Sequence, residues 1–330
     1  MSRTQLTMMT RAGKFLSVWL LFASVMAFAK TPVILSTDVG NEIDDQWAIT
    51  YMLLSPSFEV RGILSAHGPS LPDPSAHATY KVLVDVVEHR LGMLSHPPLF
   101  EGSSVPLPDK QTALDNAGVD FIIATSKEFS KDHRLTVLTI GAATDVASAI
   151  LKDPSITDRI SIVAMGFKSL AEGGKEFNIE NDPRAWQVIL DSNAPVTIGA
   201  ADVCRRDLAM SFEHAKSLVS RRGPIGGWLW EEYQEWYFRN VKPLRSGDFS
   251  KPWVIWDIVT LAHERDLTTE KEIERPKLRE DLSFGEQPGR GTIRWITAVD
   301  SQRLWDDFAA RLDMYQRSHA VDLNPGLFRR

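Results

Sequence analysis

The sequence predicts an α/β protein with an open, mostly parallel β-sheet that carries helices on both faces. Apolar, β-branched runs typical of buried strands occur at residues 32–36, 59–65, 135–140, 160–165 and 195–200. Helical patterns alternate with these runs, at residues 45–54, 76–91, 145–151 and 183–190. Apolar strands that alternate with helices are characteristic of parallel sheets. The remaining expectations are a charged surface excursion or lid at 268–287, a late strand at 292–299 and an amphipathic helix at 301–317.

The beginning of the chain has the pattern of an export signal. Three basic residues lead into an apolar run at 15–29, which ends in the small residues Ala27 and Ala29. A retained membrane anchor is the alternative, but the run is short for a span and no second one follows. We therefore expect residues 1–29 to be removed and residues 30–330 to form one domain, periplasmic or secreted, with no membrane contact after processing.

The charge and the cysteine content indicate which partners and which disulfides the protein can have. The formal charge is −6, and loss of the first 29 residues, with three basic and no acidic side chains, leaves −9. An acidic surface disfavours nucleic acids and anionic membranes as partners and favours a small neutral ligand. Cys204 is the single cysteine, so no internal disulfide forms. With no evident His partner, it is better interpreted as a small core residue than as a reactive thiol.

An oxygen-rich segment follows the first predicted strand. Seven of the ten side chains in residues 36–45 carry oxygen. A buried strand that ends in several carboxylates folds at a large electrostatic cost unless a cation lies among them. Ca²⁺ fits best, because it accepts many oxygen ligands in irregular geometry, and Asp38 and Asp45 are the best candidate ligands. The alternative is a solvated loop in which Asp44 or Asp45 only caps the next helix.

Further motifs follow this loop along the chain. They are Gly62-Ile63, Phe100-Glu101-Gly102 with Pro106-Leu107, Gly141-Ala142-Ala143-Thr144-Asp145, Glu176-Phe177-Asn178-Ile179 before Asp182-Pro183, and Asp257 at a helix start. Their order, over about residues 31–263, resembles the inosine/uridine-preferring nucleoside hydrolase family, whose Asp-Thr-Asp-Pro-Gly-x-Asp-Asp loop binds a catalytic Ca²⁺. The resemblance implies the nucleoside hydrolase fold and Ca²⁺-dependent hydrolysis of ribonucleosides to ribose and free base.

The resemblance also implies roles for individual residues. Ca²⁺ would be bound by Asp38, Asp45, Asp257 and the backbone carbonyl of Thr144, and Asp38 would accept a proton from the attacking water. Sugar or base contacts would come from Asp44, Met165, Glu176, Asn178 and Trp256. From the residues alone, Glu176 and Asn178 alternate on an expected extended segment and can point the same way. Their other interpretation is a surface charge and a turn residue. Asp182-Pro183 has the pattern of a helix start.

The chain also departs from the family pattern. Two extra residues within 41–43 lengthen the loop, so Glu42 is either a further ligand or solvent-facing. Ser36 replaces an Asp, Pro69 stands where Asn is usual, and Trp256 precedes Asp257 where some members have a His that assists the departing base. The leaving-group acid is therefore unassigned. Two alternatives stay open: a hydrolase of another glycoside, and a nucleoside- or sugar-binding protein without turnover.

A region rich in aromatic side chains admits three interpretations. It comprises Trp228, Trp230, Tyr233, Trp236, Tyr237, Trp253 and Trp256. The rings could stack on a nucleobase as a lid, pack a helix into the core, or form a contact between copies of the chain in a homo-oligomer.

Overall fold

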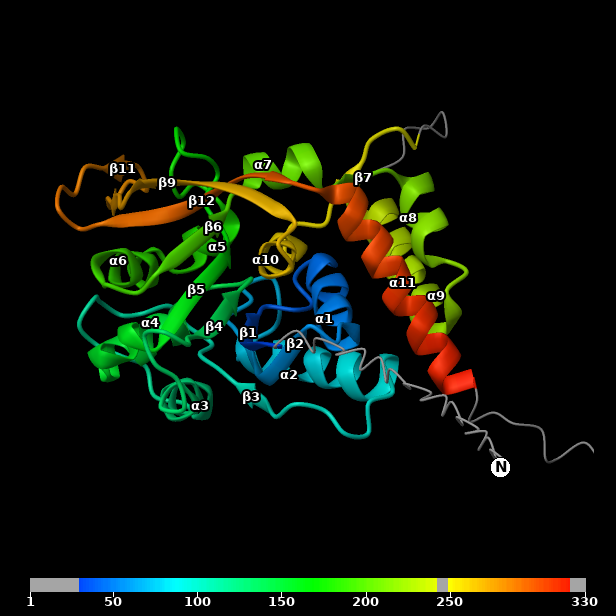
Figure 1. The fold of residues 1–330 in the computed structure, drawn as a ribbon, viewed down its shortest axis with the longest axis horizontal. Coiled ribbons are helices and arrows are strands. Elements are labelled where there is room, and N and C mark those ends of the chain that lie inside the picture. The colour runs from blue at the N-terminus through cyan, green and yellow to red at the C-terminus, as the bar shows by residue number, and fades with distance from the viewer. Residues whose placement is uncertain (1–29, 242–248, 321–330) are drawn as a thin grey trace, which may run out of the picture.

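An eight-stranded sheet forms the centre of the computed structural model, which describes residues 30–241 and 249–320 (Figure 1). In spatial order its strands are β3 (Leu99–Glu101), β2 (Phe58–Ser65), β1 (Thr31–Thr37), β4 (Leu135–Thr139), β5 (Ile160–Met165), β6 (Val196–Gly199), β12 (Thr292–Val299) and β9 (Thr268–Glu274). Adjacent strands are parallel except for the last pair, β12 and β9, which is antiparallel. The predicted α/β class with a mostly parallel sheet is confirmed.

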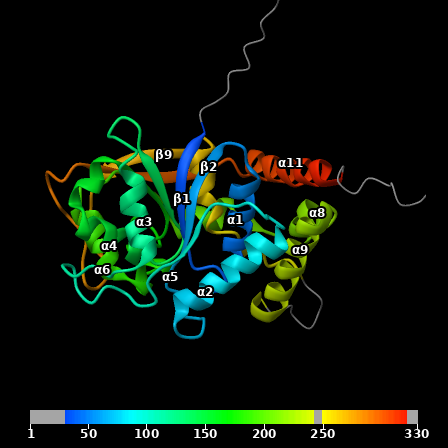
Figure 2. The same ribbon diagram turned by 90° about the horizontal axis from the view of Figure 1, so that it is seen from below.

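Helices cover both faces of this sheet, as Figure 2 shows. On one side lie α3 (Ala117–Ser126), α4 (Thr144–Lys152) and α6 (Pro183–Asp191); on the other lie α1 (Asp44–Leu54), α2 (Ser75–Val84), α8 (Phe212–Val219), α9 (Gly223–Trp236) and α11 (Ser301–Ala320). Each face has its own apolar core, because successive side chains of a strand point in opposite directions. In β1, Val33 and Leu35 belong to one core and Ile34 to the other.

Shorter elements connect these layers. They are α5 (Phe177–Asn181), α7 (Ala201–Asp207), α10 (Ile258–Glu264), a 3₁₀ turn (Pro154–Asp158), two π-helical segments (Asp85–Arg90 and Tyr237–Val241), and the two-residue strands β7 (Ala209–Met210), β8 (Trp253–Val254), β10 (Lys277–Leu278) and β11 (Phe284–Gly285). Two of these lie at the carboxyl end of the sheet and carry functional candidates: α5 and α10.

Two predicted elements differ from the structure. The helix expected over 76–91 is α-helical only to Val84 and continues as a π-helix. The excursion expected at 268–287 begins with β9, an edge strand that pairs with β12 along its whole length. Its side chains are mostly exposed and charged, so the strand has no apolar face to reveal it in the sequence.

The predicted export signal, residues 1–29, lies outside the described residues. Within 30–241 and 249–320, none of the helices combines the length and the apolar character that crossing a membrane requires.

Candidate active site

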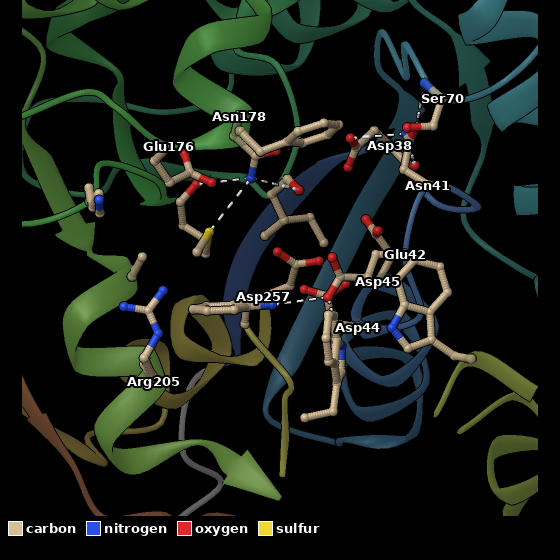
Figure 3. Close-up of a pocket in the computed structure, with 18 of the residues that line it drawn as sticks. Asp38, Asn41, Glu42, Asp44, Asp45, Ser70, Glu176, Asn178, Arg205 and Asp257 are labelled. Atoms are coloured by element: carbon tan, nitrogen blue, oxygen red, sulfur yellow. Dashed lines mark hydrogen bonds between the residues drawn. The ribbon is translucent and has the colours of Figure 1, made fainter. Parts of the chain in front are cut away.

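A pocket of about 400 Å³ opens at the carboxyl end of the sheet, where ligands bind in open α/β folds (Figure 3). Eight of the nine predicted site residues line it: Asp38, Asp44, Asp45, Met165, Glu176, Asn178, Trp256 and Asp257. They come from the ends of β1 and β5 and from the first turns of α1, α5 and α10. The fold thus gathers side chains from positions 38 to 257 at one point.

Three carboxylates converge at the floor of this pocket. Asp44, Asp45 and Asp257 each offer an oxygen within 4.8 Å of the other two, and all three are buried. Asp44 and Asp45 lie in the first turn of α1, whose N-cap position is Ile43. Neither they nor Asp257, which is the N-cap residue of α10, forms a capping hydrogen bond with its side chain. Helix capping therefore does not explain the acidic residues.

Asp38 lies on the same pocket wall, at the end of β1, but outside this trio. Asn41 holds it: the Asn41 side-chain amide donates to the Asp38 carboxylate at 3.1 Å and to its backbone carbonyl at 2.8 Å. Close approach of β4 needs Gly141, since a Cβ there would lie 3.0 Å from the Asp38 side chain. On the floor, the Thr37 hydroxyl donates to Asp45.

Burial and mutual repulsion dominate the electrostatics of the floor. Burial is the main cause that raises the pKa of Asp38, Asp44, Asp45 and Asp257 well above the ordinary value, and the charges of the neighbouring acids add to it. Of the ion pairs that the described residues form, none neutralises these four carboxyls. A cation bound among the four carboxylates would offset the electrostatic cost of burying them in the ionised form.

Glu42, from the lengthened loop, is fixed by two tryptophans. The indole nitrogens of Trp253 and Trp256 donate to the same Glu42 oxygen, at 2.8 and 3.0 Å. Burial raises the pKa of Glu42 to about 7, although the two indole hydrogen bonds oppose the shift. Glu42 therefore faces the pocket and not bulk solvent, and it contributes another acidic oxygen next to the floor.

Glu176 and Asn178 line the pocket from the start of α5; the backbone of Glu176 is extended, as the sequence predicts, but Asn178 is helical. Glu176 is the N-cap residue of α5 and accepts from the Ile179 amide at 3.2 Å, and Asn178 lies within this single helical turn. The Asn178 amide nitrogen lies 3.4 Å from the Met165 and Ile140 carbonyl oxygens. Burial raises the pKa of Glu176 to about 7. The predicted helix start at Asp182 is confirmed, since its side chain accepts from the Ala185 amide at 2.9 Å.

Thr144 is the one predicted residue that does not line the pocket. It is the first residue of α4, and its hydroxyl donates to Asp182 at 2.7 Å, away from the acidic floor. Ile140, directly after β4, lines the pocket instead. The sequence motif indicated the correct turn but not which of its residues reaches the pocket.

The aromatic region divides into core and pocket residues. Trp228, Tyr233 and Tyr237 are buried in the core beneath α9. Trp236, Trp253 and Trp256 line the pocket, and the first two meet edge to face with ring centroids 5.7 Å apart. Packing into the core is therefore confirmed for the first subset, and stacking of the second subset on a nucleobase stays a prediction.

Three basic residues at the pocket were missed by the sequence reasoning: Lys168, Lys175 and Arg205. They lie on the loop after β5, on the loop before α5 and on α7. Only Lys175, directly before Glu176, is adjacent to a motif, so no spacing in the sequence marks them as a group.

The donors on the floor suit a hard divalent cation. Buried carboxylates that are close together and lack basic partners are typical of such a site, and oxygen-only ligand sets favour Ca²⁺ or Mg²⁺ over softer metals. The single cysteine, Cys204, does not line the pocket: it is fully buried, and its thiol lies 3.7 Å from the Trp256 carbonyl oxygen.

Comparison with known proteins identifies the class. The family model of the inosine-uridine preferring nucleoside hydrolases matches residues 33–306. A purine-preferring ribonucleoside hydrolase from Gardnerella vaginalis has the same fold, with a TM-score of 0.69 at 22% identity over 87% of this chain and 100% of that one. An inosine-guanosine nucleoside hydrolase aligns with a TM-score of 0.68 at 17% identity, over 86% and 99% of the two chains.

Sequence relatives agree with the fold. An uncharacterized protein of Schizosaccharomyces pombe is 27% identical over 222 residues, covering 60% of this chain and 70% of its own length. The pyrimidine-specific ribonucleoside hydrolase RihA of Salmonella schwarzengrund is 26% identical over 204 residues, covering 53% of this chain and 61% of RihA. The fold and the acidic site define a metal-dependent N-glycosyl hydrolase. The chain belongs to the inosine-uridine preferring nucleoside hydrolase family.

Proposed function

We propose that this protein uses Ca²⁺ to hydrolyse the N-glycosidic bond of ribonucleosides, releasing ribose and the free base, with Asp38 as general base. One observation carries the proposal: Asp44 and Asp45 meet Asp257, more than 200 positions away, within 4.8 Å at the floor of a pocket that Asp38 also lines. The family and its ribonucleoside hydrolase members support ribonucleosides as the substrate class.

Asp45, Asp257 and Asp38 would hold the cation, with Asp44 either as a further ligand or bound to a sugar hydroxyl. Ca²⁺ takes six to eight oxygens, so the Ile140 carbonyl, water and ribose hydroxyls can complete the set. Thr144, whose backbone carbonyl the sequence predicts as a ligand, fits this role less well, because it does not line the pocket. A bound Ca²⁺ supplies positive charge that polarises water and lowers the pKa of the surrounding carboxyls.

The other roles in the reaction, which are proton acceptance, substrate binding and charge stabilisation, fall to the side chains of the pocket. Asp38 accepts the proton of the attacking water, and its bond to Asn41 fixes the orientation of its carboxylate. Glu176 and Asn178 bind sugar hydroxyls and hold the anomeric carbon toward Asp38. As the C–N bond breaks, the ribose carbon becomes positively charged, and the buried carboxylates stabilise that charge. Trp256 offers a ring face to the base.

The site of action would be the periplasm or the medium, because residues 1–29 have the pattern of an export signal. A soluble, processed enzyme of this kind would act on nucleosides outside the cytoplasm.

The test uses protein that begins at residue 30, with inosine and uridine as substrates and reducing sugar as the readout. We expect release with Ca²⁺, loss of release with a chelator, and a fall of about 10²–10⁴-fold in kcat for Asp38→Asn. Glu213→Asn, a change at an exposed position of α8, is the control. Binding of inosine without release would overturn the enzymatic proposal in favour of a binding protein. Release from other glycosides alone would change the substrate class.

A further inference from the structure

The pocket has a cationic side as well as an acidic floor. Lys168, Lys175 and Arg205 line it together with the four aspartates. Figure 3 shows Arg205 on the side of Glu176, whereas Asn41 and Ser70 lie on the opposite side with Asp38. The loop before α5 adds Lys175 directly next to Glu176 in the chain. Arg205 and the backbone of Lys175 therefore lie on the Glu176 side of the pocket.

Two of these cations are available to a ligand. Lys168 pairs with Glu172 at 2.8 Å. The ion pairs formed within the described residues do not include Lys175 or Arg205, and both side chains are exposed at the pocket. The Arg205 guanidinium stacks on Trp256, 5.6 Å from the ring centroid. This cation–π contact holds the guanidinium at the pocket without using its N–H donors in an ion pair.

A neutral nucleoside offers these cations no negatively charged group. Its ribose hydroxyls are served by the acidic floor and by Glu176 and Asn178, and its base faces the tryptophans. Arginine and lysine are the side chains that bind a phosphate group, arginine through two parallel N–H bonds. Arg205 lies beside Trp256, on the same side of the pocket as Glu176, so a phosphate joined to a ribose on the acidic floor could reach it.

We propose that the preferred substrates are ribosides that carry a phosphate on the 5′ oxygen, at the end of the sugar remote from the base, with Arg205 and Lys175 as the phosphate-binding residues. This inference rests on the proposed function, since it takes the orientation of the ribose from it. The reaction is unchanged: water adds to C1′, the C1′–N bond breaks, one proton of the water passes to Asp38 and the base leaves with its electron pair and takes up a proton. The phosphate ester stays intact, and the sugar product is ribose 5-phosphate.

Kinetics with matched substrates test the proposal. Inosine is compared with inosine 5′-monophosphate, and uridine with uridine 5′-monophosphate, in Ca²⁺ at low and high salt. We expect the wild type to favour the phosphorylated member by about tenfold or more in kcat/KM, because charge-assisted bonds are involved. The preference should shrink as salt screens the exposed cations. Inosine 5′-diphosphate is a third substrate that separates recognition of a monophosphate from that of a longer chain.

Variants assign the preference to the two residues. In the double variant Lys175→Gln with Arg205→Gln, the ratio of kcat/KM between nucleotide and nucleoside should fall to about one or below. Arg205→Lys keeps the charge but loses the planar fork, so an intermediate ratio is expected. Arg303→Gln, on the exposed face of α11, removes a cation far from the pocket and should leave the ratio unchanged.

Calorimetry gives a readout that does not depend on turnover. Ribose 5-phosphate should bind the Ca²⁺-loaded wild type about tenfold or more tightly than ribose, and the double variant should bind both equally. Equal binding in the wild type would overturn the inference. So would hydrolysis of inosine at a rate equal to or above that of its monophosphate, and in that case the proposed function would stand. Failure to cleave any of the substrates would refute the proposed function, and the calorimetric comparison would then decide on phosphate binding alone.

Discussion

Trp253 and Glu42, 211 positions apart, are joined by a hydrogen bond of 2.8 Å from the indole nitrogen to the carboxylate. Trp256 donates to the same oxygen. The residues added to the metal loop are therefore fixed by the segment that also carries Asp257. This contact joins the loop after β1 to the residues before α10 and places a fifth carboxylate beside the acidic floor.

Replacement of Glu42 by Gln should separate its charge from its hydrogen bonds. The amide oxygen can still accept from both indoles, whereas the charge that repels Asp44 is gone. In chelator at pH 8 we expect Glu42→Gln to melt at a higher temperature than the wild type. Its affinity for Ca²⁺ should fall by roughly an order of magnitude, because ligand charge tunes Ca²⁺ affinity. Thermal melts with and without Ca²⁺ measure both, and Glu213→Gln is the control. An unchanged Ca²⁺ affinity would show that the cation does not sense Glu42.

Ca²⁺ should stabilise the folded chain through the carboxylates on the floor. At a free concentration 100 times its Kd, a ligand that binds only the folded state adds about 2.7 kcal/mol to the free energy of unfolding. We expect a gain of this size in urea unfolding of the wild type. Asp257→Asn should abolish most of the gain, because it removes the ligand that α10 contributes to the trio. If Asp257→Asn kept the full gain, the cation would have to bind elsewhere.

Stability of the chelated protein should fall as the pH rises. Burial raises the pKa of Glu42 and Glu176 to about 7 from 4.5, so between these values the folded state holds protons that the unfolded state has released. Where the folded state binds more protons, the free energy of unfolding decreases with pH. Melting temperatures in chelator should therefore be lower at pH 8 than at pH 5.5.

Two comparisons test whether the buried carboxyls cause this fall of stability with pH. Glu176→Gln removes one of the raised groups and should make the decline with pH smaller. Ca²⁺ favours the ionised carboxyls, so saturation with it should remove most of the decline. A chelated wild type that becomes more stable from pH 5.5 to pH 8 would contradict the raised pKa values.

The sequence predicted most of the sheet and of the acidic floor because both depend on local patterns. Apolar runs mark β1 and β5, and the loop motif places Asp38 and Asp45 at a strand end and a helix start. Asp257 came from the family resemblance, and the structure places it against Asp45. β9 was missed since its exposed, charged side chains lack the apolar alternation of a half-buried strand.

What the sequence could not provide depends on contacts between distant segments. The role of Glu42 requires the position of Trp253, and the cationic side of the pocket requires α7 to face the loop before α5. The sequence motif pointed to Thr144, whereas Ile140 lines the pocket, because a motif does not define where a strand ends to within one turn. The side chain of Thr144 has a different task, in a buried network around Asp182.

That network should be a stability determinant independent of the metal. Asp182 is fully buried and accepts from the Leu107 amide at 2.8 Å, the Thr144 hydroxyl at 2.7 Å and the Ala185 amide at 2.9 Å. Asp182→Ala leaves all three donors unpaired, at about 1–3 kcal/mol each, so a loss of roughly 3 kcal/mol or more is expected in urea unfolding. Asp132→Ala, at an exposed position, is the control. A loss below about 0.5 kcal/mol would mean that water or other groups replace the carboxylate.

Cys204 should be unreactive in the folded protein. It is fully buried, and burial together with the charge of Glu176 raises the pKa of its thiol well above the ordinary value. The thiolate is the reactive form, so both effects slow modification, and labelling requires opening of the structure. At pH 8 with Ca²⁺, a thiol reagent should react roughly a hundredfold or more slowly than in concentrated urea, where one thiol per chain becomes accessible. Rapid labelling of the native protein would show that the segment between α7 and Trp256 opens, and would make Cys204 a group that reaches the pocket.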